Sequence, residues 1–398
     1  MMPVRKIVIY GLYWDSFLYT NNLLLFGIDN SLKSFCWDKM VIDHVPNDLD
    51  ALAYRCAFYQ SDFLYGIRER ALFEDSEIKE ILRNKFDRIC DIILDENELS
   101  KYRTFKTAIQ LSHLPTDIDI YKNRLYYCNS DGVFYRNIRN QNEHSIVSPK
   151  EYKCWDAYIQ CLKISRYGRI ALCASSDGLF EINTRLEKTD MYDEFQYVDE
   201  NIVKITDSHS SYCCWSFSSL LNGSYIEPSQ LFCFKYNNDM YDMEYKKSFN
   251  SDQIFNGGAS LDSFTISEGE KIYQISQNSI VGVNFLQRMI ETNDIPFQQI
   301  VSKSFTIEEK IIDCAVVEFG VVIETQKSLK VILSTGEDIF TVNKNNEDII
   351  RWRVFPRSTC YVNQLHVIYK DRIEIISFND DYFVDQKTKQ YGNQFFFK

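Results

Sequence analysis

The fold is decided by residues 169–182, which read Arg169-Ile-Ala-Leu-Cys-Ala-Ser-Ser-Asp-Gly-Leu-Phe-Glu-Ile182. Two apolar runs flank the pair Asp177-Gly178. This pattern is typical of a tight β-hairpin, because glycine accepts the positive φ that such turns require. The same unit occurs at residues 124–135, with its turn at Asp131-Gly132. The chain therefore contains a repeated hairpin.

Further hairpins of this kind follow at a steady interval. Taken from Asp131 onward, successive turns lie about 44 to 51 residues apart, which matches the ~40–50 residues of one four-stranded propeller blade. We therefore predict an all-β chain, a β-propeller of about seven blades with six or eight as alternatives, formed by residues 1–398 as a single domain. The later turns are expected near Glu227-Pro228, Asn278, Gln326-Lys327 and Lys370-Asp371.

Before Asp131 the repeat is less regular. One hairpin is predicted with its turn at Asp29-Asn30, and another within residues 55–67, with its turn near Ser61-Asp62. The distance from the latter to Asp131 is about 70 residues, which is too long for one blade. Strand-like residues near both chain ends, Lys6 to Tyr10 and Gln394 to Phe397, are each able to complete the last blade.

The excess length coincides with a helical pattern over residues 75–102. Isoleucine, leucine and phenylalanine recur there at i, i+3, i+4 and i+7, and charged residues fill the other face. Asp75 supplies a helix-capping start. We predict a helical insertion whose apolar face packs inward and whose charged face is presented to a partner, with these candidate contact residues: Lys79, Arg83, Lys85 and Asp87.

Two dipeptides carry a family resemblance. Leu32 to Asp38, ending in Trp37-Asp38, resembles the third strand of a Trp-Asp (WD) repeat, and the Asp-Gly turns resemble those between its second and third strands. A second dipeptide, Trp155-Asp156, lies out of register with the first, and the Gly-His pair that often opens such repeats is absent. The resemblance implies a divergent WD-repeat-like β-propeller.

Composition excludes several classes of protein. With 45% hydrophobic and 15% aromatic residues, the chain is expected to fold and not to be disordered. A net charge of −12 argues against general nucleic-acid binding, which needs a basic surface. No apolar stretch approaches the ~20 residues of a membrane span. The twelve cysteines form no Cys-x-x-Cys pair and lie mostly in apolar runs, so we expect reduced thiols and an intracellular protein.

No catalytic or cofactor motif is found. The phosphate-binding loops, the H-E-x-x-H motif and the G-x-S-x-G motif are all absent from the sequence, so no catalytic residue, cofactor or metal is predicted. Arg351 and Arg353, which flank Trp352, are candidate partner-binding residues that would hold a phosphate or carboxylate through two-point contacts, on the opposite side of a strand from the tryptophan. Asp117 and Asp119 are interpreted as solvated loop carboxylates.

These observations favour a non-catalytic protein-interaction scaffold or adaptor, a subunit of a larger complex. A sensor or enzyme that uses the propeller channel is one alternative, and an acidic inhibitor or immunity-type protein is another. The protein partner, pathway and oligomeric state are not readable from the sequence.

Overall fold

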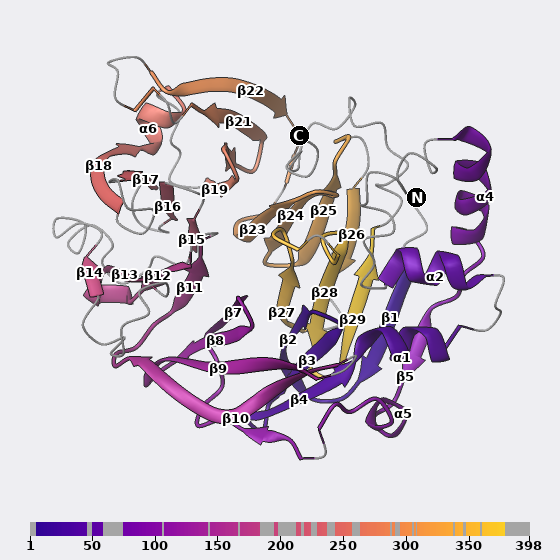
Figure 1. The fold of residues 1–398 in the computed structure, drawn as a ribbon. Coiled ribbons are helices and arrows are strands. Elements are labelled where there is room, and N and C mark those ends of the chain that lie inside the picture. The colour runs from indigo at the N-terminus through magenta and orange to yellow at the C-terminus, as the bar shows by residue number, and fades with distance from the viewer. Residues whose placement is uncertain are drawn as a thin grey trace. The chain divides into compact units, whose positions relative to one another are not determined.

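A computed structural model describes residues 5–378, with gaps at 46–49, 59–74, 106, 142–143, 166–167, 184–194, 198–211, 216–218, 224–228, 237–242, 257–262, 287–288, 291–294, 305, 308, 337–338, 345–347 and 359. The chain is a seven-bladed β-propeller, in which six blades are four-stranded sheets and blade 7 has five strands (Figure 1). The predicted fold class is confirmed. Its contacts divide it into two units, which are described separately below.

The first unit holds blades 1 and 7 and all of blade 6 except residues 311–314, together with residues 139–141 and 144–147 of blade 2. Blade 1 runs in the order β2 (Tyr13–Tyr19), β3 (Asn22–Gly27), β4 (Ser31–Cys36) and β6 (Ile109–Gln110). Blade 6 contains β23 (Ile311–Val317), β24 (Gly320–Thr325), β25 (Ser328–Leu333) and β26 (Ile339–Asn343). Blade 7 contains β27 (Ile349–Val354), β28 (Gln364–Tyr369), β29 (Arg372–Ser377), β1 (Arg5–Tyr10) and β5 (Ile92–Leu94).

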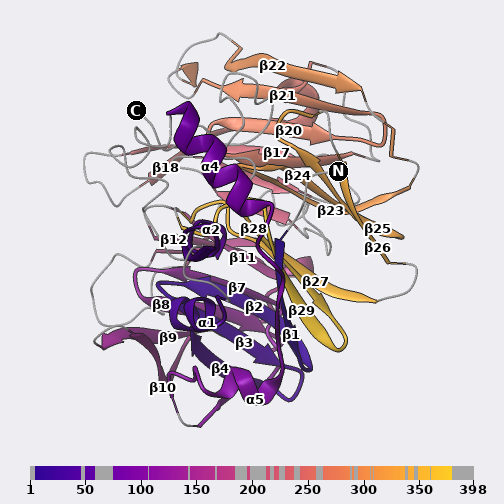
Figure 2. The same cartoon turned by 90° about the vertical axis from the view of Figure 1, so that its right-hand side faces the viewer.

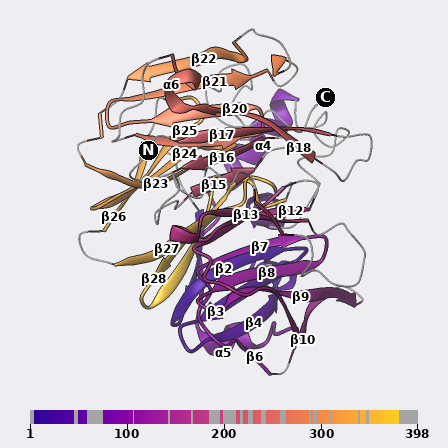
Figure 3. The ribbon, with the colours of Figure 1, turned by 90° about the vertical axis from the view of Figure 1, so that its left-hand side faces the viewer.

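The second unit holds blades 3, 4 and 5 and the rest of blades 2 and 6, and the strands of blades 2 to 5 follow the chain order (Figure 3). Blade 2 is β7 (Asp117–Tyr121), β8 (Arg124–Asn129), β9 (Gly132–Gln141) and β10 (His144–Trp155); blade 3 is β11 (Cys161–Ile164), β12 (Arg169–Cys173), β13 (Leu179–Asn183) and β14 (Phe195–Tyr197). Blade 4 is β15 (Tyr212–Trp215), β16 (Ser219–Gly223), β17 (Gln230–Tyr236) and β18 (Met243–Asn250); blade 5 is β19 (Phe264–Glu268), β20 (Lys271–Ile275), β21 (Ser279–Phe285) and β22 (Phe297–Ser304). The short α6 (Ser251–Ile254) follows β18, and a 3₁₀ turn, η2 (Ser175–Asp177), joins β12 to β13.

The hairpins predicted from the sequence are the second and third strands of the blades. Strands β8 and β9 flank the Asp131-Gly132 turn, and β12 and β13 flank Asp177-Gly178. Gly132 has φ of 140°, and a Cβ there would lie 1.9 Å from the backbone oxygen of Trp155, so only glycine fits this turn. In blades 1, 5, 6 and 7 the second and third strands likewise lie on either side of the turns expected near Asp29, Asn278, Gln326 and Lys370. In blade 4 the second and third strands are paired, and the turn expected near Glu227-Pro228 lies outside the described residues.

The N-terminal strand completes blade 7. All six residues of β1 pair antiparallel with β29, from Arg5 opposite Ser377 to Tyr10 opposite Arg372. One of the two predicted closing strands is therefore confirmed. The other, Gln394 to Phe397, lies outside the described residues.

Two expectations before Asp131 are wrong. The hairpin expected within residues 55–67 starts in a helix, α2 (Ala51–Phe58), and its second half lies outside the described residues. The single helix expected over 75–102 is α4 (Ser76–Phe86), followed by β5 and α5 (Glu96–Ser100). Continuous isoleucine spacing does not distinguish a helix from a short strand that is buried on one face, which explains the second error.

The resemblance places the Trp-Asp dipeptide at the end of the third strand of blade 1, but in the structure the dipeptide follows that strand. It does not close that strand. Trp37 and Asp38 open the helix α1 (Trp37–Asp43), and Trp37 is fully buried. The insertion between β4 and β6 therefore begins at Trp37 and contains α1, α2, α4, β5 and α5.

Candidate functional site

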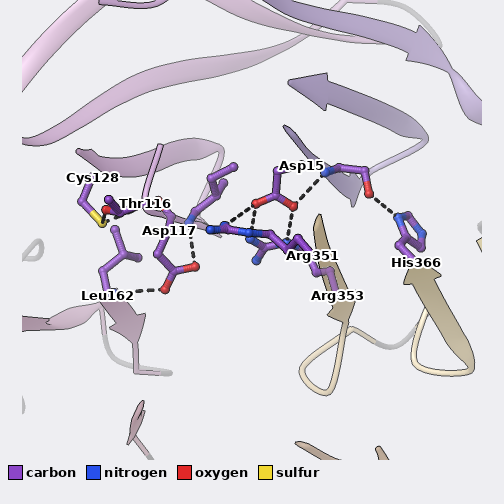
Figure 4. A network of polar contacts seen from close by, with 10 residues as sticks. Asp15, Thr116, Asp117, Cys128, Leu162, Arg351, Arg353 and His366 are labelled. Carbon is purple, nitrogen blue, oxygen red and sulfur yellow. Dashed lines mark hydrogen bonds and ion pairs between the residues drawn. The ribbon is translucent and has the colours of Figure 1, made fainter. Parts of the chain in front are cut away.

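The densest buried ion-pair cluster among the described residues joins the first strands of blades 1 and 7, both in the first unit (Figure 4). Asp15 on β2 is completely buried. Its carboxylate accepts hydrogen bonds from Arg353 Nε at 3.0 Å, Arg353 Nη2 at 2.6 Å and Arg351 Nη1 at 2.8 Å. The alternation of β27 directs both arginines to this side, because residues i and i+2 share a face of a strand. These contacts attach blade 7 to blade 1.

Electrostatics keeps Asp15 ionised. Burial alone would raise the pKa of this carboxyl group, but the charges of Arg353 and Arg351 and the hydrogen bonds outweigh burial and lower it. The two guanidinium groups also lie over aromatic rings, Arg351 over Trp14 at 5.2 Å and Arg353 over Phe17 at 5.3 Å. The cluster is thus a paired, packed interior group.

A serine–histidine pair adjoins it. The Ser16 hydroxyl and His366 Nδ1 share a hydrogen bond of 2.7 Å, and neither residue is exposed to solvent. Burial lowers the pKa of His366 to about 3, with the Arg353 charge acting in the same direction and Asp15 against it. The imidazole is therefore neutral at physiological pH. Because Ser16 is buried and the Asp15 carboxylate bonds to arginines, this group lacks the accessible nucleophile of a Ser-His-Asp triad.

The two arginines predicted to hold an anion bind an internal one. Arg353 makes the expected two-point contact with a carboxylate, and that carboxylate is Asp15. The predicted alternation along β27 is confirmed, since Trp352 Nε1 donates instead to Glu324 on β24 of blade 6 at 2.8 Å. The structure thus gives Arg351 and Arg353 a role in joining blades, and their proposed role toward an external ligand is without support.

In the second unit, two aspartates join neighbouring blades in another way. Asp117 and Asp119 lie on β7. Asp117 Oδ2 accepts the backbone N–H of Leu162 on β11 at 3.1 Å (Figure 4). Asp119 Oδ2 accepts the backbone N–H of Ile164 on the same strand at 3.2 Å. Each Oδ1 atom accepts the N–H of the following residue at 2.8 Å. The interpretation of these side chains as solvated loop carboxylates is wrong, because they lie in a strand and satisfy the backbone of the next blade.

Sequence reasoning missed Asp15, Ser16 and His366. A signal was present for the aspartates. Asp117 and Asp119 each accept a hydrogen bond from a residue 45 positions later, and this spacing equals the blade period. Asp15 shares a second feature with them: it lies on a first strand, and its Oδ1 atom accepts the N–H of the next residue. A periodic search for acidic residues inside first strands would have found this class.

Of the four candidate residues of the insertion, Lys79, Arg83 and Lys85 lie in α4, and Asp87 is its C-cap residue. Asp75 caps α4 by accepting the N–H groups of Glu77 and Ile78. Of the predicted partner contacts, Arg83 and Asp87 are exposed, while Lys79 and Lys85 are half-buried. The predicted inward packing is observed for Leu82 and Phe86, which are buried in the core of the first unit, whereas Ile81 is 50% exposed.

The insertion is built into the closure of blade 7. Figure 2 shows α1, α2 and α4 along the side of the first unit that carries β1. Strand β5 pairs in parallel with β1, with Ile7 opposite Ile92 and Ile9 opposite Leu94. It therefore covers the edge of the N-terminal strand that β29 leaves open, which is one way in which proteins protect an edge strand.

Hydrogen bonds tie the same insertion to blade 7. The carbonyl of Ala57 accepts from the Ser377 hydroxyl at 2.8 Å, and that of Phe58 accepts from Gln364 Nε2 at 3.2 Å. Arg5 on β1 donates to the carbonyl of Phe86 at 2.9 Å. The insertion is therefore attached to the blade that the N-terminal strand completes.

Within the described ranges, no group of three or more histidine, cysteine, aspartate or glutamate side chains is placed to hold a metal ion. Nor does any helix in those ranges have the length and apolar character needed to cross a membrane.

No protein-family model matches the chain, and no curated protein matches it. Among solved structures it is similar to the β-propeller domain of Cps50 (Swd1) from Myceliophteria thermophila, at 9% identity over 92% of this chain and 96% of that chain, with a TM-score of 0.48. The N-terminal domain of Nup159 gives 8% identity, 92% and 90% coverage and a TM-score of 0.43. A Bacteroides uniformis protein provisionally named a 6-phosphogluconolactonase gives 8% identity, 67% and 80% coverage and a TM-score of 0.42. Likenesses this distant carry no argument about activity or partners.

Proposed function

We propose that the protein is a non-catalytic interaction scaffold, intracellular and part of a larger complex, whose partner contacts the outward side of the insertion. One observation carries the proposal. Helix α4 buries Leu82 and Phe86 in the core, yet its outward side presents the half-exposed Ile81 among charged residues. An apolar side chain surrounded by polar groups is a common arrangement at the centre of a protein–protein contact.

The buried state of the polar cluster supports a non-catalytic role. Ser16 and His366 form a serine–histidine hydrogen bond, but both side chains are buried and inaccessible to a substrate. Arg351 and Arg353, the arginines that could hold a ligand, are paired with Asp15. The alternatives of a channel sensor or enzyme, and of an acidic inhibitor, lack a comparable observation in their favour. An intracellular site accords with ten described cysteines that are free thiols, most of them buried.

Deletion of residues 75–102 is not a usable test, because it would remove β5 and the core residues of α4. A point substitution on the outward side avoids this. We expect Ile81→Glu to abolish capture of a stable partner from native lysate, measured by affinity purification and mass spectrometry. Ile339→Glu on β26 is the matched control, since Ile339 is 51% exposed.

Both variants are expected to keep the wild-type melting temperature and circular dichroism spectrum, because both side chains are half-exposed. Capture of the same partners by the wild type, Ile81→Glu and Ile339→Glu would contradict the proposed contact surface. Turnover of a small molecule by the purified protein would contradict the non-catalytic role.

A further inference from the structure

A cluster of tyrosines and cations lies at one end of blade 2, whose strands β7 to β10 are labelled in Figure 3. It forms where β7 turns into β8, and it continues across β9 to β10. Tyr121 and Arg124 are opposite one another in the β7–β8 register, so their side chains share a face of the sheet. The tyrosine–cation cluster consists of Tyr121, Lys122, Arg124, Tyr135, Lys150 and Tyr152.

Each cation in the cluster lies over a ring of its own. Lys122 Nζ is 5.6 Å from the centre of Tyr121, the Arg124 guanidinium is 5.2 Å from Tyr135, and Lys150 Nζ is 4.6 Å from Tyr152. Tyr135 and Tyr152 are stacked, with their centres 4.9 Å apart and their planes 10° from parallel. Cation–π contacts of this kind reduce the freedom of long side chains, so the charges are held in place before anything binds.

These three cations have no carboxylate partner in the part of the chain that the structure describes. Neighbouring cations on the same blade do: Arg136 pairs with Glu151 at 2.7 Å, and Lys153 pairs with Asp156. Lys122 and Lys150 are exposed and Arg124 is half-buried. A chain with a net charge of −12 thus keeps a local group of three positive charges on a tyrosine surface.

We propose that the tyrosine–cation cluster binds an acidic segment of a partner protein, with its carboxylates placed on Lys122, Arg124 and Lys150. The cations lie over separate rings, so they suit carboxylates spaced along a peptide better than one compact phosphate. Three charges in a strongly acidic chain are also too few for the many phosphate contacts on which nucleic-acid binding depends. This surface belongs to blade 2, so the proposal goes beyond the insertion and is independent of it.

The test uses the full chain and a fluorescein-labelled hexaglutamate peptide, followed by fluorescence anisotropy at low ionic strength. We expect the peptide to bind, while hexaglutamine does not. Replacing Lys122, Arg124 and Lys150 with glutamine should weaken binding at least about tenfold, since each lost charge contact contributes a factor of a few. The control replaces Lys101, Lys327 and Lys370, all exposed, and changes the net charge equally.

A second pair of variants separates the ring contacts from charge alone. Tyr152→Phe keeps the ring beneath Lys150 and should bind as the wild type does, whereas Tyr152→Leu should weaken binding about threefold at unchanged melting temperature. Equal binding of hexaglutamate and hexaglutamine, or equal losses in the cluster and control variants, would overturn the proposal. So would an oligonucleotide or a singly phosphorylated peptide that binds tenfold tighter at the same salt.

Discussion

Replacement of Asp15 by asparagine tests whether the buried ion pairs hold blade 7 to blade 1. Asp15→Asn preserves shape but removes the negative charge between Arg351 and Arg353, leaving two guanidinium groups whose shared counter-charge is gone. Removing one partner of a buried ion pair costs about 3–5 kcal/mol. Arg351 is 23% exposed and regains some hydration in the variant. We therefore expect the free energy of unfolding to fall by an amount near the lower end of this range, about 3 kcal/mol.

The geometry also predicts an order among single substitutions. Arg353 makes two hydrogen bonds to Asp15 and is 11% exposed, while Arg351 makes one. Arg353→Gln should therefore destabilise more than Arg351→Gln, and Asp15→Asn more than either. Urea denaturation at pH 7, followed by tryptophan fluorescence, measures the midpoint and slope for each variant.

The matched control is Asp348→Asn. Asp348 pairs with Lys370, but both side chains are about 70% exposed, and exposed pairs contribute little. We expect Asp348→Asn to leave the midpoint of urea denaturation unchanged. A shift for Asp15→Asn no larger than that for Asp348→Asn, or a reversed order of the two arginine variants, would refute the assignment of this cluster as the junction between the blades.

Three further outcomes are expected. Because the folded protein keeps His366 neutral with a pKa of about 3 while the unfolded chain binds a proton near pH 6.5, the free energy of unfolding should fall below pH 6.5 by about 1.4 kcal/mol per pH unit until about pH 3, and urea denaturation of His366→Gln should lack this slope. Gly132→Ala should lower the melting temperature through a cost of about 1–3 kcal/mol, because its Cβ would meet the backbone oxygen of Trp155, and a stability equal to the wild type would contradict the turn geometry. Leu82→Ala should cost about 2–5 kcal/mol and speed hydrogen exchange of the β1 amides measured by mass spectrometry, whereas unchanged β1 exchange would show that α4 does not secure the closing strand.

The repeat could be predicted from the sequence because one hairpin per blade has strong local chemistry. Turns such as Asp131-Gly132 and Asp177-Gly178 are fixed by residues adjacent in the chain, and their spacing gives the blade count. Residues 92–94 had no such local signal. Their three residues become a strand only because β1 offers an unpaired edge, and that edge is a tertiary feature.

The polar residues between blades illustrate the same limit. Asp15 and Arg353 are 338 positions apart, and Ser16 and His366 are 350 apart. Nothing in either neighbourhood indicates the other, so the sequence suggests an external anion for Arg351 and Arg353, whereas in the structure they bind the internal carboxylate of Asp15. Asp117 and Asp119 were misread because an acidic residue in an isolated stretch favours solvent, and only the neighbouring strand β11 provides the backbone donors that hold them.

The fold explains only some of the side chains in the insertion and in the tyrosine–cation cluster. Closure of blade 7 explains why Leu82, Phe86 and β5 are present, but it does not explain an exposed Ile81 on the outward side of α4. Similarly, blade packing accounts for the half-buried faces of Tyr121 and Tyr135, but not for three cations that have no carboxylate partner among the described residues. Ile81, Lys122 and Lys150 are exposed to solvent, so substitutions at these positions should separate binding from folding. Those positions are where a partner can be sought without unfolding the protein.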